Sequence, residues 1–240
     1  LEYPGIKVER RVLSSAELLD MIPSSLEAGE GPVLFNLSSE EISSLLISGA
    51  LEPVDSSILD TSLFIDGSFE GVTLGGKIYG IPREYINWCL YVNKAALDEA
   101  GLPLPRTWED IVGIAESLSV HDGPILRNRV FDFRYPYYLT FFIPMVEQLG
   151  GSLVGPDGSF VYGDEAWIKA LSFMQEWGPL GKNLGSPTLV NARTLFNTED
   201  SLMCLSGLYQ GERIKEQNPE FYGSDRWAVL PFPVFEDSVA

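Results

Sequence analysis

The chain has 240 residues, enough for one large or two modest domains with a sizeable core. Its hydrophobic content of 45% and aromatic content of 12% are typical of globular proteins and exclude an intrinsically disordered chain. The net charge of -18 argues against binding to nucleic acid or anionic membrane surfaces, and suits a protein that handles neutral or cationic small molecules.

The first 50 residues predict two strands that alternate with two helices. Residues 6–12 alternate apolar and polar side chains, as a half-buried strand does, and residues 32–36 form an apolar run typical of buried parallel strands. Helices are expected over 14–28, with a kink at Pro23, and over 39–48. This order predicts an α/β arrangement with right-handed crossovers.

Residues 54–76 predict a loop-rich, solvated surface. The acids in this region lack the ligand spacing and the glycine of a calcium loop. A short apolar strand from Lys77 follows, and then an extended segment rich in aromatic side chains. A helix from Lys94 to Ala100 ends at Gly101, and a second helix begins at Thr107, whose hydroxyl suits an N-cap.

The second half of the chain predicts further helices and strands in alternation. In chain order these are a helix ending at Leu149, a β-hairpin with its turn at 156–158, a helix capped by Asp164, a short helix over 191–197, and strands over 202–205 and 228–233.

Four ordered motifs carry a resemblance to a known family. They are Tyr79-Gly80-Ile81-Pro82, Asn93-Lys94, Ala100-Gly101-Leu102 and Pro105-Arg106-Thr107-Trp108. Their order resembles the central segment of the family 1 extracellular solute-binding proteins, the maltose-binding-like receptors of ABC sugar importers. The chain departs from the family pattern at Val92, where the family usually has Tyr.

The resemblance implies an α/β, bilobal, periplasmic-binding-protein-like fold of type II. Lobe 1 would comprise residues 1–81 and 231–240 and lobe 2 residues 82–230, with hinge crossings near 82–88 and 229–233. The family's first strand and roughly its last third have no counterpart here. We therefore expect a chain truncated at both ends, with an incomplete first lobe and without the signal peptide or lipid anchor of the family.

The implied function is a non-catalytic receptor that closes two lobes around a carbohydrate, expected to be an oligosaccharide. Such a receptor is a periplasmic monomer or surface lipoprotein, needs no cofactor, and delivers its solute to membrane ABC permease subunits. Two alternatives stay open. One is a receptor for a polyamine or other non-sugar solute. The other is a carbohydrate-active hydrolase, whose reaction needs two facing carboxylates about 5 to 10 Å apart, here Glu40 and Glu84.

In the first lobe, the resemblance places candidate ligand-binding side chains after the segment that begins at Pro32. They are Asn36, Ser38, Ser39 and Glu40. Glu40 falls where maltose-binding members carry a sugar-binding acid. A first-turn acid favoured by the helix dipole explains Glu40 equally well.

In the crossover segment, a charged pair precedes aromatic and amide side chains that suit a sugar. These candidates are Arg83, Glu84, Tyr85, Asn87 and Trp88. Trp88 could instead fill a gap in the core.

In the second lobe, Tyr137 aligns with a stacking Tyr of the family, and Tyr135 falls where maltose-binding members carry Glu. Tyr209 follows a Gly turn at a strand end and is the preferred stacking residue. By contrast, Phe141, Phe142, Trp167 and Trp177 are expected in the core.

The remaining reactive side chains predict no catalytic or metal chemistry. Cys89 and Cys204 permit one disulfide, but two separate, buried thiols are favoured. His121 is the single histidine and lies in a polar loop, so zinc binding and Ser–His or Cys–His catalysis are disfavoured.

Overall fold

A computed structural model describes residues 4–55, 57–134, 137–155, 159–186 and 188–239. The chain divides into two compact units, unit 1 (Leu1–Tyr85) and unit 2 (Ile86–Ala240). The boundary lies a few residues beyond the predicted lobe boundary at 81/82. Among the described residues, no helix is both long enough and apolar enough to span a membrane.

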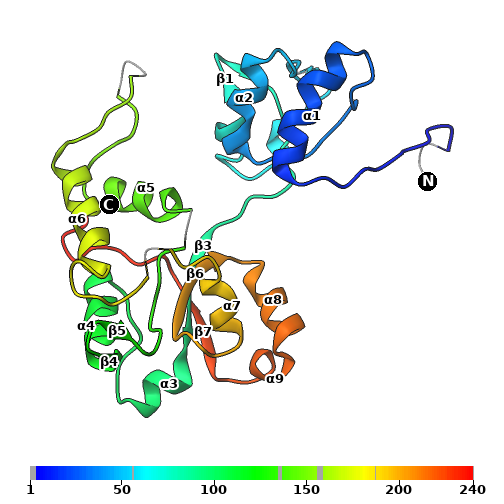
Figure 1. The fold of residues 1–240 in the computed structure, drawn as a ribbon. Coiled ribbons are helices and arrows are strands. Elements are labelled where there is room, and N and C mark those ends of the chain that lie inside the picture. The colour runs from blue at the N-terminus through cyan, green and yellow to red at the C-terminus, as the bar shows by residue number, and fades with distance from the viewer. Residues whose placement is uncertain (1–3, 56, 135–136, 156–158, 187, 240) are drawn as a thin grey trace. The chain divides into compact units, whose positions relative to one another are not determined.

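Unit 1 is built from short helices and one small hairpin (Figure 1). Its described elements are α1 (Ser15–Glu27), η1 (Ser39–Glu41), α2 (Ile42–Ile47), η2 (Thr61–Leu63), η3 (Glu70–Val72), β1 (Thr73–Leu74) and β2 (Lys77–Ile78).

Both helices predicted in the first 50 residues are present. A capping box begins α1: the Glu17 amide donates to Ser14 Oγ at 3.4 Å, and the Ser14 amide donates to the Glu17 carboxylate at 2.8 Å. Pro23 lies inside α1. Ile22 of α1 is buried, as are Ile42 and Leu45 of α2.

The two strands predicted in the same region are wrong. Residues 6–12 and 32–36 are neither strand nor helix, and Val33 and Leu34 are 96% and 89% exposed. A strand needs a neighbour for its backbone N–H and C=O groups. Among the described residues no strand pairs with either segment, so the crossovers predicted from them are not formed.

Unit 2 is organised around a three-stranded antiparallel sheet of order β6-β3-β7. The strands are β3 (Trp88–Asn93), β6 (Met203–Gly207) and β7 (Trp227–Leu230). Side chains alternate along β3, so that Leu90 and Val92 join one core, whereas Cys89 and Tyr91 join a second core. Helices therefore cover both faces of the sheet (Figure 1).

The larger core surrounds Trp108 at the start of α4 (Trp108–Leu118). Thr107 caps this helix as predicted, because Asp110 donates its amide to Thr107 Oγ1 at 3.0 Å. Helices α5 (Leu139–Gln148) and α6 (Glu165–Trp177) also pack on this face, and Asp164 caps α6.

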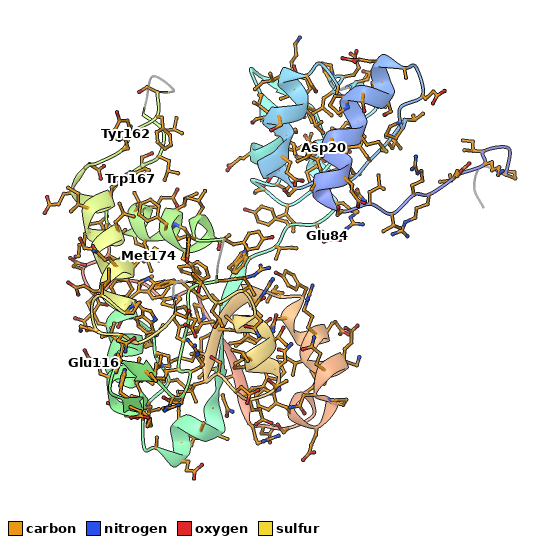
Figure 2. The ribbon with its side chains drawn as sticks, viewed as in Figure 1. Asp20, Glu84, Glu116, Tyr162, Trp167 and Met174 are labelled. Carbon is orange, nitrogen blue, oxygen red and sulfur yellow. The ribbon has the colours of Figure 1, made fainter. Side chains whose placement is uncertain are left out.

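The predicted core aromatics lie on this face. Phe141, Phe142 and Trp177 are buried. Trp167, labelled on α6 in Figure 2, is half-buried with its ring 4.9 Å from that of Phe142.

The smaller core lies on the opposite face, beneath α7 (Ala192–Asn197), α8 (Gln210–Gln217) and α9 (Pro219–Tyr222). Cys204 is buried there and Cys89 is half-buried, and both are free thiols. The remaining described elements are α3 (Lys94–Glu99), β4 (His121–Asp122) and β5 (Ile125–Leu126). An antiparallel bridge joins Val154 to Phe160 in the predicted hairpin, whose turn at 156–158 lies outside the described residues.

The C-terminal segment packs within unit 2, and its predicted assignment to lobe 1 stays a prediction. Residues 231–240 cluster with unit 2. The rings of Phe232 and Phe235 pack 5.7 and 6.3 Å from that of Trp108, and Val239 donates its amide to Gln148 O at 2.9 Å. Aromatic burial explains why this segment stays with unit 2. The hinge assignment at 82–88 and 229–233 stays a prediction.

Candidate functional site

One end of the sheet in unit 2 brings several predicted site residues together. Trp88 begins β3 directly opposite Gly207, the last residue of β6. Tyr209 follows Gly207 by two residues and forms the N-cap of α8. Ends of strands are where α/β folds commonly place ligand-binding side chains.

Because Gly207 has no side chain, it leaves room for the Tyr209 ring to pack against the backbone. A Cβ atom at Gly207 would lie 2.5 Å from Tyr209 Cε1 and 2.6 Å from Ile86 Cγ2, closer than real contacts permit. From the other face, the buried Tyr91 hydroxyl donates to the carbonyls of Gly207 and Leu208, at 3.3 Å each. The Tyr91 hydroxyl therefore holds the backbone of the turn, and the Tyr209 ring packs directly against Gly207.

Two arginines surround the Tyr209 ring. Arg193 on α7 donates to the Tyr209 hydroxyl and, at 3.3 Å, to Ser206 Oγ. The guanidinium carbons of Arg193 and Arg213 each lie 5.5 Å from the ring centroid, within cation–π range. The Tyr209 ring is half-buried, so it is not enclosed in the core, and Tyr209 lies two residues after the end of β6.

A third arginine, Arg134, joins the same group. It follows a segment that runs beside β6, where Met203 donates its amide to Val130 O at 2.8 Å. The guanidinium of Arg134 lies 4.0 Å from the ring centroid of Tyr137. Burial lowers the pKa of Arg134, and Arg193 and Arg213 lower it further by charge repulsion.

We call this set the arginine–tyrosine cluster: Arg134, Tyr137, Arg193, Tyr209 and Arg213. Its side chains come from three separate segments of unit 2. Together they present two flat aromatic surfaces and guanidinium donors, which suit a small solute with both apolar faces and hydrogen-bonding groups.

A buried network of polar side chains supports the cluster from beneath. Ser206 Oγ donates to Gln210 Oε1 at 3.0 Å, and Gln210 Nε2 donates to Asn197 Oδ1 at 2.6 Å and to the carbonyl of Arg193 at 3.2 Å. All three side chains are buried. Because their polar groups are paired inside unit 2, the network holds α7, β6 and the start of α8 in register.

The predicted site residues of unit 1 lie on exposed, irregular or 3-10 backbone. Asn36, Ser38 and Ser39 are exposed. Ser38 has a local structural role, because its amide donates to the Glu41 carboxylate at 3.2 Å in the cap of η1. Glu40 lies in η1, but its side chain lies outside the described part of the structure.

The crossover segment is largely exposed and has irregular backbone up to the start of β3. Arg83, Glu84 and Tyr85 are exposed, and Figure 2 labels Glu84 on an extended stretch that precedes β3. Arg83 and Glu84 pair with one another. Such an exposed pair stabilises a fold little, so it gives no indication of a buried binding charge.

The remaining predicted residues lie in unit 2. Asn87 is exposed, and Trp88 is half-buried with its ring edge against Phe141 at 6.1 Å, so its ring packs partly on the core. Tyr137 is 50% exposed beneath Arg134. Tyr135 lies outside the described residues. A ligand-binding role for each of these residues stays a prediction.

Sequence reasoning missed the arginines of the cluster. A signal existed for Arg213, which lies four residues after Tyr209 and therefore on the same face at the start of α8. Arg134 and Arg193 gave no such signal, because tertiary packing alone brings their segments together. Among the described residues, no group of three His, Cys, Asp or Glu side chains could hold a metal ion.

Comparison with known proteins places the chain in context. Residues 2–239 match the family model of the bacterial extracellular solute-binding proteins. The arabinooligosaccharide-binding protein of Halalkalibacterium halodurans is 25% identical over 115 residues, which cover 47% of this chain and 25% of that protein.

Two solved structures share the fold. UgpB from Mycobacterium tuberculosis, solved with glycerophosphocholine, has a TM-score of 0.81 at 19% identity over 98% of this chain and 60% of its own. The GacH receptor of Streptomyces glaucescens, solved without ligand and with acarbose, has a TM-score of 0.79 at 19% identity over 99% of this chain and 61% of its own. These matches confirm the predicted α/β, type II fold, and this chain spans only part of the length of each relative.

Proposed function

The chain belongs to the family of bacterial extracellular solute-binding proteins, and we propose that it is a non-catalytic receptor that binds a saccharide and delivers it to the permease subunits of an ABC transporter. The proposed place of action is outside the cytoplasm. The solute class is supported by the names of the relatives: one binds arabinooligosaccharides, and another was solved with acarbose.

The observation that carries the proposal is the placement of Tyr209. Its ring is half-buried at the end of β6, supported by Gly207 and flanked by Arg193 and Arg213. A sugar ring presents C–H faces that stack on an aromatic ring and hydroxyl groups that accept from guanidinium donors. Tyr137 beneath Arg134 would supply a second such surface.

The alternatives have less support. A hydrolase needs a carboxylate pair, but Glu84 is exposed and paired with Arg83. A polyamine would meet the like charges of Arg134, Arg193 and Arg213 at this face. We therefore favour a saccharide receptor over both.

Calorimetric titration of the full-length protein with neutral and acidic mono-, di- and trisaccharides tests the proposal. A bound saccharide should lose about 1 to 3 kcal/mol of affinity on Tyr209→Ala, by analogy with base–aromatic stacking, with a smaller change in folding stability. Tyr162→Ala is the matched control, because Tyr162 is 75% exposed and lies outside the cluster.

Two results would contradict the proposal. Binding of polyamines, but of no saccharide, in the same titration would contradict a saccharide as the solute class. Release of shorter sugars from an oligosaccharide during the titration would replace the receptor by an enzyme.

A further inference from the structure

We infer that the solute carries an anionic group, a carboxylate or a phosphate ester, which Arg134, Arg193 and Arg213 bind beside the ring of Tyr209. The inference rests on the proposed function and names the chemical class of solute for the same site. It runs against the overall charge of -18, which by itself favours a neutral or cationic solute.

The first observation is that these arginines have no acidic partner among the described residues. Elsewhere in the described chain, Arg83, Arg127, Arg129 and Arg226 each pair with a carboxylate. Arg10, Arg11 and Arg106 form no such pair among the described residues, but they do not gather at one place as the cluster arginines do. None of the ion pairs between described residues includes an arginine of the cluster. In a chain with 34 acidic and 16 basic residues, it is notable that no described carboxylate pairs with these three guanidinium groups.

The second observation is an unsatisfied donor. Arg134 Nε is buried and has no hydrogen-bond partner among the described residues. A buried donor without a partner costs free energy, more so when it is charged. A solute anion at the cluster would pair with the positive charge of the guanidinium groups and offset part of this cost.

The third observation is that two of the three guanidinium groups, those of Arg193 and Arg134, are held in place before any ligand arrives. Arg193 is held by Ser206 and by the Tyr209 hydroxyl, and Arg134 lies over the Tyr137 ring. Planar guanidinium groups match the two oxygens of a carboxylate or a phosphate. The start of α8, at Tyr209, adds the positive end of a helix dipole.

The test is calorimetric titration of the full-length protein with matched pairs of ligands. One arm compares oligosaccharides that end in a uronate with their neutral counterparts. The other compares sugar phosphates with their parent sugars, and inorganic phosphate alone serves as a further probe. The two arms separate a carboxylate from a phosphate as the recognised group.

The variants are Arg134→Gln and Arg213→Gln, with Arg127→Gln as the control that removes the same charge from an exposed hairpin. Each cluster variant should weaken the charged ligand about tenfold or more, whereas the control should change its affinity less than twofold. Affinity for the charged ligand should also fall as salt rises. If Arg134→Gln does not fold, Arg213→Gln decides alone, because Arg213 is exposed on α8.

The outcomes separate the two proposals. Equal affinity for charged and neutral saccharides, unchanged in both cluster variants, would overturn the inference and leave the saccharide receptor intact. Binding of inorganic phosphate that depends on the cluster arginines, with no binding of any saccharide, would support the anion site and overturn the proposed solute class. Absence of binding by every probe would overturn both.

Discussion

The two units differ in how their apolar side chains are covered. In unit 2, a three-stranded sheet buries apolar side chains on both faces beneath helices. In unit 1, only Ile22, Ile42 and Leu45 are buried among the described hydrophobic side chains, and residues such as Val33 and Leu34 are exposed.

The difference shows that an apolar run is not enough to make a strand. The runs of unit 2 find partners, as Leu90 does opposite Leu205 and Leu230. The run over 32–36 finds none among the described residues, so its backbone stays irregular. Stability in this chain should therefore depend on unit 2, and mutations can test that contrast.

The largest expected effect is at Trp108, whose side chain is 0% exposed and packs against rings from three segments of unit 2. Trp108→Ala should lower the free energy of unfolding by about 3 to 5 kcal/mol, measured by urea denaturation, because it leaves a large cavity. Trp108→Phe is the matched control and should cost less, since Trp108 Nε1 has no hydrogen-bond partner among the described residues. Equal losses in both variants would contradict a cavity effect.

A second effect depends on pH and reports on Asp132, buried in unit 2. Burial raises the pKa of Asp132 to about 6 from its ordinary 3.8, although the Ser186 amide and Arg129 oppose the rise. The folded state therefore holds this proton more tightly than the unfolded state. The resulting stabilisation is complete below about pH 4 and is lost as pH rises through 6, a change of roughly 3 kcal/mol.

Asp132→Asn removes this titration. The difference in unfolding free energy between wild type and variant should shift in favour of the variant between pH 4 and pH 7. Because other carboxylates with lowered pKa values, such as that of Asp110, titrate in both proteins, only the difference is diagnostic. A difference that stays constant over this range would show that Asp132 is ionised throughout.

A third prediction concerns a single methyl group at the site. Gly207→Ala places a Cβ against Tyr209 and Ile86 and should cost about 1 to 3 kcal/mol of folding free energy. Gly211→Ala is the control, because an added Cβ there meets nothing within 4 Å and lies in α8, where Ala is favoured over Gly. The cost of Gly207→Ala should shrink in a Tyr209→Ala background, as a double-mutant cycle would measure. If Gly207→Ala cost as much in the Tyr209→Ala background, the Tyr209 ring would not be the group that the added methyl meets.

Much of the fold could be predicted because its signals are local. Thr107 with Asp110 and Asp164 before α6 are caps that depend on a few neighbouring residues. Strand pairing is different, because it depends on distant segments, and that is why the strand over 32–36 was predicted wrongly. The packing of Phe235 likewise depends on distant segments, since its core partners lie far away in sequence.

The candidate site divides along the same line. Tyr209 could be predicted because a glycine turn precedes it and a helix follows it. Arg134 and Arg193 could not, since the cluster forms only when a segment beside β6, helix α7 and helix α8 meet. The net charge of -18 predicts a neutral or cationic solute, because a sum over the whole chain does not show that three arginines gather at one place.

The smallest expected effect is at Val33 in unit 1. It tests whether the apolar side chains of unit 1 are as exposed as the structure shows. Val33 is 96% exposed, so Val33→Ser should change the free energy of unfolding by less than about 0.5 kcal/mol in urea denaturation. The control within the same unit is Ile22→Val, which should cost about 0.5 to 1.5 kcal/mol because the Ile22 side chain on α1 is 0% exposed. If Val33→Ser instead cost more than Ile22→Val, its side chain would have to be covered in solution. The segment over 32–36 would then have a partner that the described residues do not provide, and its apolar run would indicate a strand after all.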